Sequence, residues 1–154
     1  MLKQQDFDTD TVINIVVPDL NAAGIAALAG GLLKAATVKA DADVADALIR
    51  ELQLAPLGEG LAVTAVKVPS LISSSSVLAK LSAPSDLLGP DQRPVDLVCV
   101  LFYPESESVH YLRRLSRLSR LLKNADLCRK IRETQDADTI RTLFQNPNGW
   151  MLAA

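Results

Sequence analysis

Residues 95–103 form an almost continuous apolar run, Val-Asp-Leu-Val-Cys-Val-Leu-Phe-Tyr, in which Asp96 is the only charged side chain. A run of this length and composition predicts a central strand that is buried on both faces. Pro104 follows directly, and it ends the strand because proline cannot donate to a sheet ladder. A strand buried on both faces needs helices on both sides of its sheet, so the run favours an α/β fold.

The remaining segments alternate between strand and helix patterns. Strands are expected at residues 12–17, 60–68 and 77–83, with a serine-rich connection at 69–76. Helices are expected at 22–36 after an Asn21 cap, from an Asp41 or Asp43 cap to Leu52, and at 106–123, 125–134 and 137–145. No repeat or linker divides the pattern. The sequence therefore predicts an α/β sandwich formed by a single domain over residues 1–154.

Composition excludes several functional classes. The 154 residues carry a formal net charge of −2, which argues against general nucleic-acid affinity. The N-terminus lacks the pattern of a secretory signal, and the apolar stretch at 22–33 is too short to span a membrane, so we expect a cytoplasmic protein. Cys99 and Cys128 are isolated and the chain has one histidine. These residues predict two buried thiols, with neither a metal site nor a disulfide framework.

The segment 106–123 has a helical period. Apolar residues recur at three- and four-residue spacing and predict one buried stripe: Val109, Leu112, Leu115, Leu118 and Leu122. Four arginines are then expected to point mostly outward: Arg113, Arg114, Arg117 and Arg120. They form either a solvated face or a docking surface for an acidic partner. His110 lies beside the stripe, and by pattern alone it is either a structural or a functional histidine.

Gly-Glu-Gly-Leu-Ala-Val-Thr-Ala at residues 58–65 resembles the active loop of a known family, Gly-x-Gly-Ile/Val-Ala-Ile/Val-Pro-His. That family is the type-2 enzyme IIA group of the bacterial phosphotransferase system, which includes fructose, mannitol and nitrogen-regulatory IIA proteins. Ordered matches elsewhere strengthen the resemblance: 44–51, Pro84, 91–98, 108–118 and 127–132. The resemblance covers roughly residues 10–145 and leaves 146–154 as a tail.

The resemblance implies a mixed sheet with helices on both faces, and a phosphohistidine formed from the phosphocarrier HPr. It places Thr64 at the family's proline and Ala65 at the phosphate-accepting histidine. His110 falls on the family's helper histidine and Arg50 on its pocket arginine. We therefore expect Arg50, His110 and Thr64 to form an anion-binding pocket, with no catalytic residue at Ala65, no cofactor and no metal.

These implications predict a regulatory binding protein rather than an enzyme, with a kinase, a transporter or a phosphorelay protein such as HPr as its partner. One alternative is a phosphocarrier in which His110 receives the phosphoryl group directly. Another is an unrelated small-molecule binder on the same scaffold. The tail contains the only tryptophan, Trp150, followed by Met151 and Leu152. This apolar cluster either packs on its own chain or forms a contact in a homo-oligomer.

Overall fold

The computed structural model describes residues 11–15, 22–36, 38, 41–81 and 87–145. The elements in chain order are β1 (Thr11–Ile15), α1 (Ala22–Ala35), α2 (Ala42–Leu54), β2 (Pro56–Gly58), β3 (Leu61–Lys67), β4 (Ser75–Leu81), β5 (Leu97–Tyr103), the 3-10 turn η2 (Glu105–Glu107), α3 (Tyr111–Leu122), α4 (Ala125–Glu133) and α5 (Ala137–Gln145). Among these residues, no helix is both long enough and apolar enough to cross a bilayer.

The strands form one mixed sheet in the order β1-β4-β5-β3-β2. The pairs β1–β4 and β3–β5 are parallel, whereas β4–β5 and β2–β3 are antiparallel. All seven residues of β5 are buried, and β5 lies in the middle of the sheet. The prediction of a central, doubly buried strand is therefore confirmed, although the strand starts at Leu97 and not at Val95.

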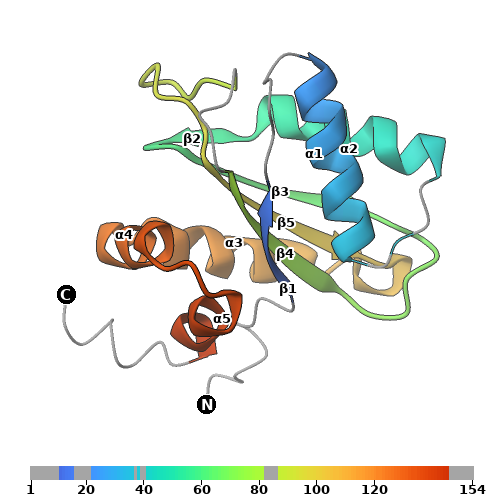
Figure 1. Cartoon of the computed structure of the whole chain (residues 1–154). Helices are drawn as coiled ribbons and strands as arrows, with labels where there is room; N and C mark the ends of the chain where they lie inside the picture. The colour runs from blue at the N-terminus through green and yellow to red at the C-terminus, as the bar shows by residue number, and fades with distance from the viewer. Residues whose placement is uncertain (1–10, 16–21, 37, 39–40, 82–86, 146–154) are drawn as a thin grey trace.

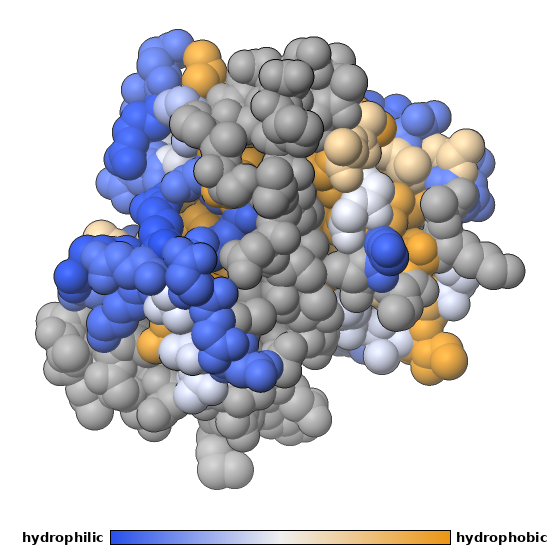
Figure 2. Space-filling model, in the orientation of Figure 1, coloured by the Kyte–Doolittle hydropathy of each residue, from blue (hydrophilic) through white to orange (hydrophobic). Residues whose placement is uncertain are grey.

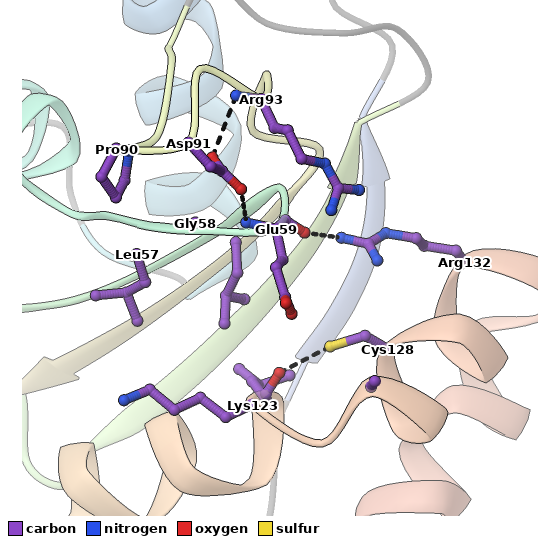
Figure 3. A pocket seen from close by; sticks show the side chains of 12 residues that line it. Leu57, Gly58, Glu59, Pro90, Asp91, Arg93, Lys123, Cys128 and Arg132 are labelled. Atoms are coloured by element: carbon purple, nitrogen blue, oxygen red, sulfur yellow. Dashed lines mark hydrogen bonds between the residues drawn. The ribbon is translucent and has the colours of Figure 1, made fainter.

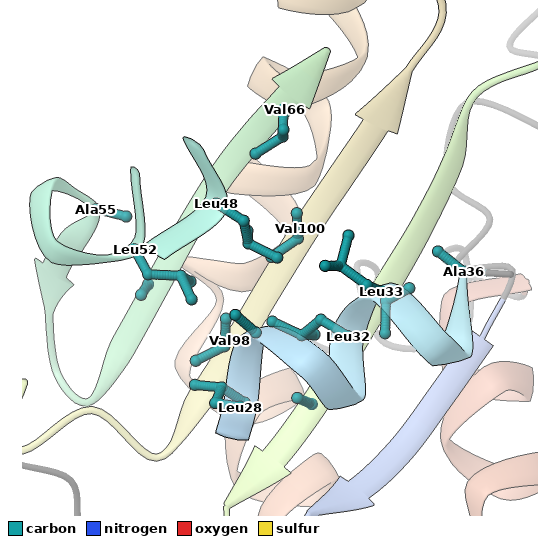
Figure 4. Packing of buried hydrophobic residues seen from close by; sticks show 14 of the residues in the cluster. Leu28, Leu32, Leu33, Ala36, Leu48, Leu52, Ala55, Val66, Val98 and Val100 are labelled. Carbon is teal, nitrogen blue, oxygen red and sulfur yellow. The ribbon is translucent and has the colours of Figure 1, made fainter. Parts of the chain in front are cut away.

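Helices cover both faces of this sheet (Figure 1), as the sequence predicts. Alternate side chains of β5 supply the two cores, because successive residues of a strand point to opposite faces. Val98, Val100 and Phe102 form the first core with residues of α1 and α2 (Figure 4). Leu97, Cys99 and Leu101 form the second core, on the other face, with residues of α3, α4 and α5. The predicted fold class, a single-domain α/β sandwich, is confirmed.

Two of the helices begin at side-chain caps. Asp41 has extended backbone angles, and its Oδ1 accepts a hydrogen bond of 2.9 Å from the Asp43 amide. Asn124 likewise accepts a bond of 3.0 Å from the Leu127 amide. Each cap satisfies a donor that the first turn of a helix leaves unpaired. The structure thus selects Asp41 from the two predicted caps of α2, while the Asn21 cap predicted for α1 lies outside the described residues.

Some predicted boundaries are wrong. The short strand β2 was not expected, and β4 begins at Ser75, inside the segment predicted as a connection. The helix predicted from residue 106 begins only at Tyr111. The 3-10 turn η2 occupies 105–107, and a turn follows at 108–110. Residues 16–17 and 82–83, at the ends of two predicted strands, lie outside the described residues, as does the 146–154 tail.

Candidate functional site

Thr64 and Ala65 lie in the middle and toward the end of β3, and their side chains take opposite faces of the sheet. Ala65 is half-buried and packs against the second core, as do Tyr111 and Leu115 of α3. Thr64 is only 7% exposed. Strand alternation directs it to the other face, together with Ala62 and Val66 of the first core. The position that the resemblance assigns to the phosphate acceptor is thus an alanine that packs against the second core.

Aromatic and charged side chains surround this end of β3 and β5. Tyr103 stacks on Tyr111 with ring centroids 4.1 Å apart and an interplanar angle of 1°. Burial raises the pKa of Tyr103 above its ordinary value, and the nearby Tyr111 raises it further. Lys67, directly across from Tyr103 in the parallel ladder, forms an exposed ion pair of 2.9 Å with Glu105. The stacked rings therefore lie at the C-terminal end of β5, whose last residue Tyr103 pairs with Lys67, two residues beyond Ala65.

His110 and Arg50 stand on helices that cover opposite faces of the sheet. His110 is the exposed N-cap residue of α3, and its side chain makes no capping hydrogen bond. Arg50 is exposed on α2. Strand alternation directs Thr64 to the face that α2 covers. Convergence of Arg50, His110 and Thr64 on an anion stays a prediction.

The start of α3 presents apolar side chains to solvent. Val109 is 84% exposed and Leu112 is 58% exposed, so their predicted burial is wrong. The buried residues of this helix are Leu118, Leu121 and Leu122. Periodicity identifies a helix face, whereas burial also requires a surface that covers it, and no described residue covers Val109 or Leu112. An exposed apolar pair beside arginines is typical of a surface that contacts a partner.

A second polar cluster lies at the opposite end of β3, around the turn that joins β2 to β3. Gly58, Glu59 and Gly60 all have positive φ angles, at 105°, 56° and 79°. The Asp91 carboxylate accepts hydrogen bonds from the Glu59 amide at 2.8 Å and the Arg93 amide at 3.2 Å. The bond from Glu59 is the main cause that lowers the pKa of Asp91 below its ordinary value. Asp91 thus fastens the turn to the loop before β5 (Figure 3).

Arg132 links the same turn to helix α4. Its Nε and Nη2 donate to both Asp96 carboxylate oxygens at 3.0 and 2.9 Å, and Nη2 also donates to the Glu59 carbonyl at 2.7 Å. The partners are 36 and 73 residues away in sequence. This role of Arg132 was not predicted, because no local pattern links such distant residues. From the sequence alone, Arg132 is only a basic residue on the polar face of a helix.

A cavity of about 810 Å³ adjoins this cluster. Its walls come from the β2–β3 turn, the loop at 90–93, the end of α3 and the start of α4 (Figure 3). Figure 2, in the orientation of Figure 1, shows two hydrophilic areas on the side of the molecule where α4 lies. Hydrophobic atoms are visible between these two areas. Arg50, Thr64 and His110 do not line this cavity.

Comparison with proteins of known sequence points to one family. Residues 9–146 match the model of the phosphoenolpyruvate-dependent sugar phosphotransferase system, EIIA 2. A nitrogen regulatory protein of Bradyrhizobium diazoefficiens is 35% identical over 91 residues, which are 59% of this chain and 60% of that protein. A nitrogen regulatory protein homolog of Haemophilus influenzae is 31% identical over 91 residues, covering 58% and 56%. The match thus spans less than two thirds of these relatives.

Solved structures support the same fold. The nitrogen regulatory protein IIA-Ntr from Neisseria meningitidis superposes with a TM-score of 0.68 at 16% identity, covering 88% of this chain and 93% of that one. The mannitol IIA protein from Escherichia coli gives a TM-score of 0.63 at 15% identity, covering 88% and 96%. At such identities the likeness concerns the fold alone. The family model, in contrast, matches nearly the whole sequence, and the chain therefore belongs to the phosphotransferase system EIIA type-2 family.

Proposed function

We propose that this chain is a nitrogen-regulatory type of IIA protein that cannot be phosphorylated at the family's acceptor position and acts as a regulatory protein-binding module. The observation that carries the proposal is Ala65, an alanine that packs against the second core at the position that the resemblance assigns to the acceptor histidine. Phosphoryl transfer to a side chain requires a nucleophile, and a methyl group has no lone pair. Supporting groups such as His110 can orient a phosphate or stabilise its charge, but they cannot replace the attacking atom.

The binding surface of the module is the start of α3. Val109 and Leu112 supply exposed apolar area, and α3 carries four arginines and no acidic residue. Apolar anchors flanked by arginine are typical of protein interfaces, in which arginine is enriched. The surface fits a partner with an acidic face. The resemblance to the IIA family favours a phosphorelay protein of the HPr type, or a kinase or transporter regulated through the relay.

A phosphorylatable IIA protein changes the charge at one surface position by about −1.5 to −2 units when it accepts phosphate. This chain would lack that switch, so its partners should bind equally with the relay charged or discharged. The measurement is quantitative mass spectrometry of proteins captured by the tagged full chain from cytosol in both states. Loss of the partners when the relay is charged, with the chain itself unmodified, would place the sensing in the partner and contradict a fixed signal.

The same capture experiment tests the proposed surface. Leu112→Glu introduces a charge at the centre of the apolar pair, and we expect captured partner to fall by about tenfold or more, the effect of losing one interface anchor. Leu54→Glu is the matched control, because Leu54 is also an exposed leucine, at 76%, but lies on α2. Equal capture by the wild type and Leu112→Glu would exclude the start of α3 as the interface.

His110 supports one alternative function. Its ring is exposed at the start of α3, on the same side of the sheet as Ala65. It is also the only histidine of the chain, so a phosphohistidine could form only at His110. We favour the binding module, because a ring that supports a neighbouring acceptor is not also in line for attack on the phosphoryl group.

A further inference from the structure

The cavity at the N-terminal ends of β3 and β5 has a volume of about 810 Å³, within the range of small-molecule sites. Its lining is Leu57, Gly58, Glu59, Leu61, Pro90, Asp91, Arg93, Leu122, Lys123, Ala125, Cys128 and Arg132. Leucine side chains thus share the walls with three cations. Such a combination of apolar surface with a few convergent charged groups is the usual composition of a ligand site.

The three cations of the cavity differ in how they are paired. The charged ends of Arg93 and Lys123 have no hydrogen bond or ion pair with any residue that the structure describes. Arg132 is held in place by Asp96 and by the Glu59 carbonyl. Figure 3 shows the Arg93 guanidinium directed toward that of Arg132. Asp96 already offsets the charge of Arg132, and the planar donors of the Arg93 guanidinium match carboxylate and phosphate.

The acidic residues of the wall differ in their roles. The Asp91 carboxylate is occupied by the backbone amides of Glu59 and Arg93. The Glu59 carboxylate is exposed and makes no ion pair within the described part of the chain. Glu59 therefore opposes an anion in the cavity. Among the described lining residues, Arg93 and Lys123 are the cations without an ion pair, and Glu59 is the carboxylate without a bonded partner, so the unpaired groups include one more cation than anion.

The cavity wall is built by close backbone packing. A Cβ atom added at Gly89 would lie 2.9 Å from the Asp91 Oδ1 atom and 3.1 Å from the Gly58 Cα atom. The loop before β5 and the β2–β3 turn are therefore in direct contact, and Asp91 and Arg132 fasten the turn from two sides. A wall fixed before the ligand arrives loses little conformational entropy on binding.

We propose that this cavity binds a small organic anion, a carboxylate or a phosphate monoester with an apolar body. The anionic group lies between Arg93 and Arg132, and the apolar body contacts Leu61 and Leu122. The site is independent of the proposed loss of the acceptor histidine, because it lies at the other end of β3 from Ala65. It gives a protein without a phosphorylation switch a surface that a small molecule can occupy.

The test is a titration of the ¹⁵N-labelled full chain with phenyl phosphate, followed by amide chemical shifts. Inorganic phosphate, benzoate and benzyl alcohol separate the contributions of phosphate, carboxylate and apolar body. We expect saturable shifts at Gly58, Glu59, Gly60 and Lys123 with phenyl phosphate or benzoate, weaker shifts with inorganic phosphate and none with benzyl alcohol. Absence of saturable shifts at these residues, or equal shifts with benzyl alcohol, would overturn the proposal.

Charge variants sharpen the test. Arg93→Gln should raise the dissociation constant about tenfold, the effect of losing one charge-assisted hydrogen bond. Glu59→Gln should lower it, because it removes the opposing charge. Arg113→Gln is the control, since this exposed arginine lies on α3 and outside the cavity lining. A fold check by the amide spectrum accompanies each variant. Equal affinities of the wild type and Arg93→Gln would contradict an anion site between the two guanidinium groups.

Discussion

Replacing Gly60 by alanine is expected to lower the free energy of unfolding by about 3 kcal/mol, the sum of a left-handed backbone and a steric clash. Gly60 has a φ of +79°, which a side chain opposes. Its added Cβ would lie 2.6 Å from the Asp96 Oδ1 atom and 2.9 Å from the Arg132 Nη2 atom. Those two groups hold each other by hydrogen bonds, so relief of the clash would break the link between α4 and the turn.

Gly30→Ala is the matched control for this prediction. Gly30 lies in α1 and is exposed, and an added Cβ would meet no atom within 4 Å. Alanine is the better helix former by about 0.5–1 kcal/mol, so this variant should be slightly more stable than the wild type. Urea unfolding followed by circular dichroism measures both variants. A Gly60→Ala protein as stable as the wild type would contradict the described geometry of the turn.

Leu118→Ala is expected to lower the free energy of unfolding by about 3 kcal/mol, within the range for buried leucines. Leu118 is fully buried in the second core, where it packs with residues of the sheet and of α4. Truncation removes transfer free energy and leaves a cavity, because the surrounding side chains relax only in part. The midpoint of urea unfolding should fall, with an unchanged denaturant slope.

Leu112→Ala provides the comparison on the same helix. The sequence pattern assigns Leu112 and Leu118 to one buried stripe, whereas the structure leaves Leu112 58% exposed. Substitution of an exposed residue usually changes stability by less than about 0.5 kcal/mol. If both variants lost the same stability, the apolar stripe would extend over the start of α3, and the proposed binding surface would be part of the core.

Local patterns in the sequence predicted the strands and helices wherever the pattern and the tertiary environment agree. The run ending at Tyr103 is doubly buried because it pairs with β3 and β4 in the centre of the sheet. Asp41, one of the two predicted caps of α2, accepts a bond from the amide two positions away. Such short-range chemistry is fully visible in one sequence. The start of α3 was misplaced, because a 3-10 turn and a helix share nearly the same apolar spacing over a few residues.

The candidate site was only partly predictable. The role of position 65 followed from the resemblance, but the packing of Ala65 against the second core depends on how α3 lies against β3. The cavity lined by Arg93 and Arg132 was not predicted at all. It is assembled from a turn, a loop and a helix that are far apart in sequence, and no single segment of the chain carries its pattern.

The proposed absence of a phosphoryl acceptor can be tested on the intact protein. The full chain is incubated with phosphoenolpyruvate, enzyme I and HPr, and its mass is compared with that of Ala65→His and His110→Ala. Ala65→His is preferable to a double change that also restores proline, because Thr64 pairs with Val100 within β3 and proline would disturb that ladder. Slow labelling of Ala65→His would show that the scaffold still docks with HPr, whereas its inertness would indicate a wider divergence of the site.

Wild-type protein should keep its mass, whereas one phosphoryl group would add about 80 Da. An increase of that size in the wild type would contradict the account. Its loss in His110→Ala would then identify His110 as the acceptor, and its persistence would point to another residue.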